Sequence, residues 1–140
     1  MHSDIMAIHF RGDNGFLSVF NIYNEITNND TLKALENYSD LNECLIRPTT
    51  TDCIIWLGDF NQHHLIWEDD NNEHLFEPED RIAPLINLLY KHDMLLTLLK
   101  EKPILQTSAS NWTRLDNVWR CNTLDDPIIR CDTVPAIHPP

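Results

Sequence analysis

Residues 53–64 read C-I-I-W-L-G-D-F-N-Q-H-H, and this stretch decides the fold of the chain. Five apolar residues, two of them β-branched, run directly into Gly-Asp, which predicts a strand buried on both faces that ends at a turn. Successive side chains of an extended chain alternate sides, so Asp59 and Asn61 are expected to project the same way while Phe60 turns back into the core. The sequence therefore predicts a carboxylate and a carboxamide at one point.

The two polar groups at the end of this strand suit the hydrolysis of a phosphate ester. That reaction needs a base that takes a proton from water and a neutral donor that holds an oxygen gaining negative charge. Asp59 would be the base and Asn61 the donor. The alternative is an ordinary turn in which the Asp and Asn side chains bond their own backbone, as is common for Gly-Asp pairs.

The longer string at residues 56–64, W-L-G-D-F-N-Q-H-H, resembles the endonuclease/exonuclease/phosphatase superfamily of metal-dependent phosphoesterases. Within it, the string is similar to the G-D-F-N-x-H-H hallmark of the apurinic-type endonuclease domains of non-LTR retrotransposons. Two further strings agree in their order along the chain. Residues 21–24, N-I-Y-N, resemble the N-x-Y-x segment, in which Tyr23 would reach the phosphate. Residues 111–118, N-W-T-R-L-D-N-V, resemble the R-x-D-x-V strand, in which Asp116 would orient the catalytic histidine.

The resemblance implies a set of site residues. Four match positions with catalytic roles in the family: Asp59, Asn61, Tyr23 and Asp116. Four more match neighbouring positions and are weaker or supporting candidates: Asn21, His63, His64 and Arg114. Taken without the resemblance, Tyr23 fits a half-buried strand tyrosine and Asp116 a surface residue. The implied cofactor is Mg²⁺ or Mn²⁺, but no metal ligand is assigned, since the family's metal-binding Glu belongs upstream of Met1.

The remaining pattern predicts an α/β (α+β) fold. Strand-like runs at residues 4–10 and 16–22 are joined by a glycine-containing loop and predict a β-hairpin. Apolar residues at helical spacing predict a helix at residues 31–46, with Asn29 or Asp30 available as its N-cap, and a second helix at 79–92. An apolar run predicts a strand at 94–99. The resemblance implies an incomplete four-layer α-β-β-α sandwich of the deoxyribonuclease-like type, with mixed sheets flanked by helices.

Within the second predicted helix, Pro84 restricts where the helix begins. Proline removes a backbone donor and is tolerated at about the first turn, so the helix is expected to start near Asp80. Its buried face is expected to carry four residues: Ile82, Leu85, Ile86 and Leu89.

The length of 140 residues and the 42% hydrophobic content predict one domain. The N-terminal strands of the family and its C-terminal Ser/Thr-Asp-His signature have no match in this sequence. We therefore expect residues 1–140 to form a single partial endonuclease/exonuclease/phosphatase domain.

The formal net charge of −12 predicts weak binding of this chain alone to DNA, because affinity for a polyanion comes mainly from Lys and Arg. Seven acidic residues between Trp67 and Arg81, with no basic residue among them, predict a solvated loop in preference to a metal site. Four cysteines without close spacing predict buried thiols in preference to disulfides or zinc. Neither a membrane span nor a signal peptide is expected, which favours an intracellular protein, nuclear by family.

Three functions follow from these observations. The leading hypothesis is a metal-dependent phosphodiesterase that nicks DNA, belonging to a retroelement with a reverse-transcriptase domain. The second is a catalytically inactive remnant of such a domain, since the metal-binding Glu and the catalytic His of the family lack a match. The third is a phosphatase acting on a small or lipid phosphate, which an acidic protein does more easily than bind DNA.

Overall fold

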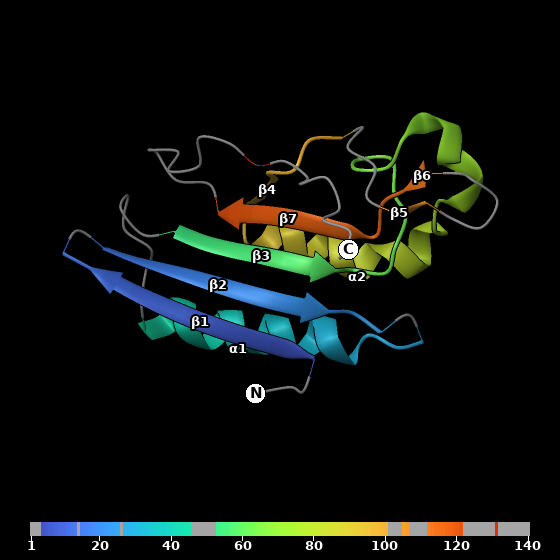
Figure 1. The fold of residues 1–140 in the computed structure, drawn as a ribbon. Coiled ribbons are helices and arrows are strands. Elements are labelled where there is room, and N and C mark those ends of the chain that lie inside the picture. The colour runs from blue at the N-terminus through green and yellow to red at the C-terminus, as the bar shows by residue number, and fades with distance from the viewer. Residues whose placement is uncertain are drawn as a thin grey trace, which may run out of the picture.

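A computed structural model describes residues 4–13, 15–25, 27–45, 53–100, 105–106, 112–121 and 131 of the protein. Its centre is a five-stranded mixed sheet with the strand order β1-β2-β3-β7-β4 (Figure 1). The strands in that order are β1 (Ile5–Gly12), β2 (Gly15–Tyr23), β3 (Cys53–Asp59), β7 (Asp116–Cys121) and β4 (Met94–Leu96). The predicted α/β fold with a mixed sheet is confirmed.

Both parallel and antiparallel pairs occur in the sheet. β1 and β2 form the predicted hairpin, with Gly12 opposite Gly15, so the strands are longer and the turn is tighter than predicted. β2 runs parallel to β3, and the crossover between them contains a helix, as parallel neighbours require. β3 and β4 both pair with β7 in the antiparallel direction.

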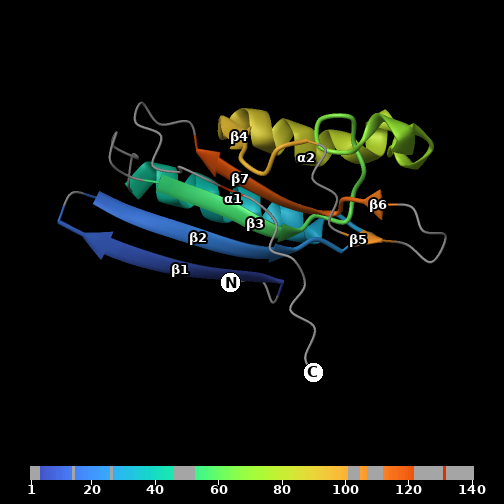
Figure 2. The ribbon, with the colours of Figure 1, turned by 45° about the horizontal axis from the view of Figure 1, so that its top comes forward.

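A second, smaller pairing joins β5 (Leu105–Gln106) to β6 (Trp112–Thr113). Figures 1 and 2 place this pair at the end of the large sheet where β3 finishes. β6 is followed directly by residues 114–115, which lead into β7 at the same end of the sheet.

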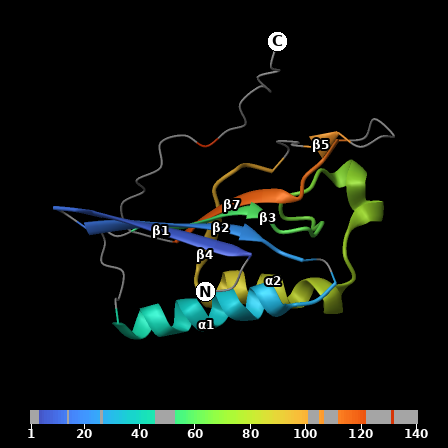
Figure 3. The same cartoon turned by 60° about the horizontal axis from the view of Figure 1, so that its bottom comes forward.

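Two helices cover one face of the sheet (Figure 3). They are α1 (Asp30–Leu45) and α2 (Glu79–Lys91), and Lys91 Nζ lies 3.1 Å from Glu36 Oε1 between them. The core between helices and sheet contains large side chains with almost no exposed surface: Ile22, Leu35, Trp56, Leu85 and Trp119. Burial of this apolar surface is the main stabilising contribution to the fold.

The start of α1 agrees with the sequence. The Lys33 amide donates to the carbonyl of Asn29, and the Asp30 amide donates to Asn28 Oδ1. Asn29 therefore occupies the predicted cap position, with its neighbour Asn28 supplying the side-chain acceptor.

Three details of α2 and β4 differ from the predictions. Pro84 lies in the second turn of α2, because Pro78 caps the helix and the helix begins at Glu79. Leu88 belongs to the buried face of α2, whereas Ile86, which the sequence predicts there, is only half-buried. β4 is shorter than predicted, since the amides of Thr97 and Leu98 both turn toward the carbonyl of Val118.

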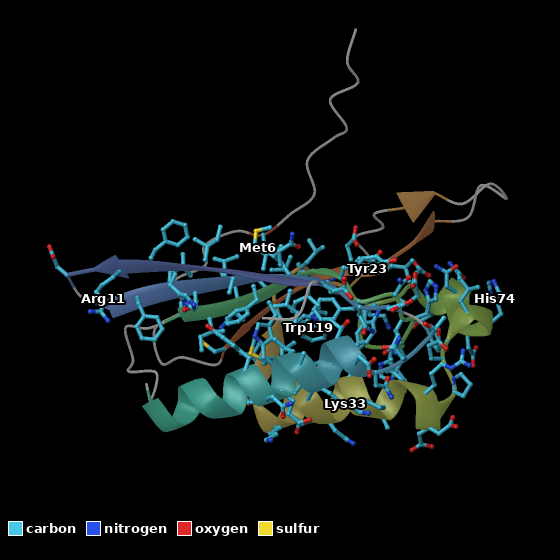
Figure 4. All side chains as sticks on the ribbon, turned by 90° about the horizontal axis from the view of Figure 1, so that it is seen from below. Met6, Arg11, Tyr23, Lys33, His74 and Trp119 are labelled. Atoms are coloured by element: carbon cyan, nitrogen blue, oxygen red, sulfur yellow. The ribbon has the colours of Figure 1, made fainter. Side chains whose placement is uncertain are left out.

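The two faces of the sheet differ in their covering. On β1, Ile5 is buried toward the helices, whereas Met6, Ile8 and Phe10 are each at least half exposed. Figure 4 shows Met6 on the side away from the helices and Trp119 between the sheet and α1. The described residues thus form one sheet layer and one helix layer of the expected sandwich.

Three cysteines in the described part of the chain are free thiols: Cys53, Cys121 and Cys131. Cys53 and Cys121 are buried, and the Cys121 sulfur accepts a hydrogen bond from the Ile54 amide at 3.2 Å. The Cys53 thiol and the Ile54 amide lower the pKa of Cys121 to about 6, against the effect of burial. No helix among the described residues is long and apolar enough to cross a membrane.

Gly58 of β3 is paired with Ile22 of β2 and leaves no room for a side chain. Its φ is +133°, and a Cβ atom added there would lie 2.0 Å from the carbonyl oxygen of Ile22. The colliding atoms belong to the backbone of a central strand, so they cannot move aside without breaking the pairing.

We expect Gly58→Ala to lower the free energy of unfolding by about 3 kcal/mol or more, measured by urea denaturation. Gly12→Ala is the matched control, because its Cβ would lie at an ordinary 3.7 Å from the Gly15 carbonyl oxygen. The control is expected to change stability by about 1 kcal/mol at most. Equal stability of the two variants would contradict the close approach of β2 and β3.

Candidate functional site

Three of the predicted catalytic residues lie in one row at one end of the sheet. Tyr23 is opposite Asp59 in the β2–β3 pair, and Asp59 is opposite Asp116 in the β3–β7 pair. Directly paired residues of neighbouring strands point to the same face of a sheet, so the three side chains share a face. By its register this is the open face that carries Met6, and Figure 4 shows Met6 and Tyr23 on that side.

Asn21 lies on the same face, two residues before Tyr23 on β2. Both side chains are exposed, Tyr23 by 52%. Tyr23 therefore presents its hydroxyl at the rim of the row, and Asn21 lies beside it toward the middle of the sheet.

Asn61 lies in the turn that follows β3. Phe60 is fully buried and its amide donates to the Leu115 carbonyl, which ties the turn to the segment before β7. Asn61 has a φ of +56°, in the left-handed region that Asn tolerates better than most residues. Its backbone amide donates to Asp59 Oδ1 at 2.8 Å, and its Nδ2 donates to the Asn24 carbonyl at 3.1 Å.

The bond from Asn61 to Asp59 is the local turn that the sequence offered as the alternative reading. It leaves the second carboxylate oxygen of Asp59 and the second amide hydrogen of Asn61 outside any hydrogen bond among the described residues. Turn and site are therefore compatible, since the bond that closes the turn holds the Asp59 side chain against the Asn61 backbone, and the Asn61 side chain is held separately by the Asn24 carbonyl.

The two carboxylates of the row affect one another. Partial burial and the negative charge of Asp59 raise the pKa of Asp116 above its usual value. Two carboxylates in neighbouring strands repel when both are ionised, and a cation between them relieves that repulsion. The row is thus electrostatically suited to a positively charged ligand.

His63 and His64 have different surroundings. His63 Nδ1 lies 2.6 Å from Glu68 Oε2. His64 Nδ1 accepts from the Ile66 amide at 3.3 Å, its ring packs on Trp67 at 5.2 Å, and burial lowers its pKa. Both imidazole rings therefore make their contacts within the loop after β3.

Glu68 corrects the prediction that the acidic run is a solvated loop. It is only 1% exposed and accepts hydrogen bonds from His63 Nδ1, Asn72 Nδ2 at 2.9 Å and the Arg114 amide at 3.2 Å. Part of the run also forms the 3-10 helix η1 (Asp70–Leu75), capped by Asp69. The other acidic residues of the run are partly or fully exposed.

Arg114, a supporting candidate from the sequence, is 1% exposed and therefore does not face a ligand. Its guanidinium donates to the carbonyls of Leu98 and Leu99 and to Asn117 Oδ1. Burial lowers its pKa to about 10, against the opposite effect of the Glu68 charge. Arg114 and Glu68 together connect the end of β4, the loop after β3 and the start of β7.

Sequence reasoning missed Glu68 and Asn72 as parts of this region. Glu68 stands in an acidic run, and its buried partner Arg114 is 46 residues away. The only local signal is the preceding Trp67, which is fully buried and donates to the Gln62 carbonyl.

The mixed five-stranded sheet with helices over one face is an α/β fold of the deoxyribonuclease-like type. A family model described as endonuclease-reverse transcriptase matches residues 17–136. The chain belongs to this family, and the resemblance read from residues 21–24, 56–64 and 111–118 is confirmed.

Among solved structures, the chain is similar to the endonuclease domain of TRAS1, a telomere-specific non-LTR retrotransposon. The TM-score is 0.61 at 16% sequence identity, over 86% of this chain and 51% of that one. The chain thus spans about half the length of that solved domain. No curated protein matches it.

We expect Glu68→Ala to lower the free energy of unfolding by about 2–4 kcal/mol, because it removes the buried carboxylate that accepts hydrogen bonds from His63, Asn72 and Arg114. Glu73→Ala makes the same change at an exposed position of η1 and is expected to cost about 0.5 kcal/mol or less. Urea denaturation of both variants measures the difference. A Glu68→Ala protein as stable as its control would contradict the buried network.

Asp116→Asn is expected to stabilise the protein near neutral pH. A carboxyl pKa that is higher in the folded state means that stability falls as pH rises through that pKa, and Asn removes this loss. The gain should therefore shrink as the pH is lowered toward about 3.9, the ordinary pKa of Asp, measured by urea denaturation across pH. Asp13→Asn, in the exposed hairpin turn, is the control without a gain. A gain at low pH only would contradict the repulsion between Asp59 and Asp116.

Proposed function

We propose that this chain carries the central part of a phosphodiesterase site of a retroelement endonuclease domain that nicks DNA. The observation that supports this most is the row Tyr23, Asp59 and Asp116, with Asn61 bonded to Asp59 at its end. In this arrangement the free oxygen of Asp59 takes a proton from the attacking water. The second amide hydrogen of Asn61 then donates to the phosphoryl oxygen that gains charge.

The other two residues of the row bind and orient. The exposed hydroxyl of Tyr23 is placed to donate to a phosphate oxygen from the neighbouring strand. Asp116 would orient the imidazole of the family's catalytic histidine, which has no counterpart among the described residues. Orientation of an imidazole by a carboxylate decides which ring nitrogen faces the substrate.

The donor set of the row fits Mg²⁺ or Mn²⁺. Asp59 raises the pKa of Asp116, and a divalent cation beside both would remove this unfavourable interaction. The Asn61-bonded oxygen of Asp59 and one oxygen of Asp116 would hold the ion with water completing its shell, which leaves the second oxygen of each carboxylate for the role given above, since Mg²⁺ is often bound by only one or two carboxylates. When bound, the ion would stabilise the negative charge that develops at the phosphate.

The substrate and the partners belong to the same proposal. The acidic composition implies that this chain alone binds DNA weakly, so the remainder of the domain would supply much of the affinity. A reverse-transcriptase domain in the full-length element, with action in the nucleus, completes the proposal.

An inactive remnant is the second candidate, and one observation favours it. Within the described ranges, no group of three or more His, Cys, Asp or Glu side chains is arranged to hold a metal ion. A phosphatase for small or lipid phosphates is the third candidate, favoured by the acidic composition alone.

The test is nicking of supercoiled plasmid with Mg²⁺ or Mn²⁺, comparing the chain with Asp59→Ala and with Asp80→Ala, an exposed control on α2. We expect nicking that depends on the added metal, falls about a hundredfold or more in Asp59→Ala, and is unchanged in Asp80→Ala. Equal background nicking by all three proteins would favour the remnant. Hydrolysis of a small phosphate ester without plasmid nicking would favour the phosphatase.

A further inference from the structure

Asn24 is a fully buried polar residue directly after β2 and lies outside the four catalytic candidates. Its backbone amide donates to the Asp59 carbonyl at 2.8 Å, and its Nδ2 donates to the Phe60 carbonyl at 2.9 Å. Its own carbonyl accepts from Asn61 Nδ2 at 3.1 Å. One residue thus contacts three consecutive residues of the turn after β3.

The bond to the Phe60 carbonyl has a particular consequence. That carbonyl belongs to the peptide between Phe60 and Asn61, so fixing it fixes the plane from which the φ of Asn61 is measured. Asn61 has a φ of +56°, which costs energy in a residue with a Cβ and persists only where the surroundings impose it. A hydrogen bond that is excluded from water is well suited to impose it.

The orientation of the Asn24 amide depends on this one bond. Asn24 Oδ1 is buried and accepts no hydrogen bond from the described residues, so Nδ2 alone sets which way the side chain points. A buried polar side chain with an unused acceptor is uncommon, so the bond from Nδ2 is the polar interaction that offsets the burial of this side chain.

We propose that Asn24 is the positioning residue of the site: its side-chain amide holds the Phe60–Asn61 peptide so that the Asn61 amide and the Asp59 carboxylate meet at one point. The catalytic consequence rests on the proposed function. The positional consequence does not, because it can be measured in the absence of any substrate. Asn24 itself touches no reacting atom in this proposal.

The test compares Asn24→Ala with Asn72→Ala, a second buried Asn whose Nδ2 bonds a side chain in the loop after β3. The readout is hydrogen exchange of the Asn61 backbone amide, which donates to Asp59 Oδ1, relative to the slowest amides of β2 and β3. In Asn24→Ala we expect the protection of the Asn61 amide to fall at least tenfold more than the protection of the core amides. In Asn72→Ala we expect the protection of the Asn61 amide and that of the core amides to fall by the same factor. Wild-type protection of Asn61 in Asn24→Ala, or equal selective loss in both variants, would overturn the proposal.

A measurement on the wild-type protein covers the case in which Asn24→Ala does not fold. The Asn24 side-chain amide hydrogens should exchange at least tenfold more slowly than those of Asn71, which is exposed on η1. Equal exchange would overturn the proposal without any variant.

Activity separates this inference from the proposed function. If the wild-type chain nicks plasmid, Asn24→Ala should lower kcat about tenfold with little change in KM. The reason is that the Asn61 amide would be misplaced mainly for the transition state. A fall in kcat equal to that in Asn72→Ala would contradict a positioning role. If the wild-type chain does not nick, the proposed function fails while the exchange result still decides the role of Asn24.

Discussion

The close approach of the β2 and β3 backbones at Ile22 and Gly58 is the constraint on which the rest of the structure depends. A side chain at Gly58 would collide with the Ile22 backbone, so the parallel pairing in this register requires glycine there. The next pair along the two strands is Tyr23 with Asp59. The glycine of the G-D-F-N string therefore sets the register that brings the carboxylate beside the tyrosine, and the site follows from the packing of the sheet.

The alternation of side chains along the strands then divides the sheet into two unequal faces. The face under α1 and α2 contains the buried core, including Trp56 and Trp119. The opposite face carries the row of site residues at one end and exposed apolar side chains on β1. The chain also spans about half of the solved domain to which it is similar. Among the described residues the helices lie on one face of the sheet only, and the incompleteness of the sandwich stays a prediction.

Features that depend on neighbours in the sequence could be predicted, and features that depend on distant partners could not. The hairpin, the cap at Asn29 and the strand that ends at Asp59 follow from local composition and spacing. The burial of Glu68 depends on Arg114, and the early end of β4 depends on the Val118 carbonyl. Nothing beside these residues in the sequence indicates their partners, so a charge run was read as a solvated loop.

Three features that do not favour stability lie within a few residues of one another. Gly58 has a φ that few residues adopt, Asn61 has a left-handed backbone, and Asp59 is paired with Asp116 of like charge. Each is held by groups that are buried nearby, such as the Phe60 ring in the core and the Glu68 network behind the loop. Backbone strain and like charges gather at sites that bind or react more often than elsewhere in a fold. Phe60 is fully buried, whereas the carboxylates of Asp59 and Asp116 lie on the face of the sheet opposite the helices, so the packing that holds the strained turn is separate from the groups that would meet a ligand.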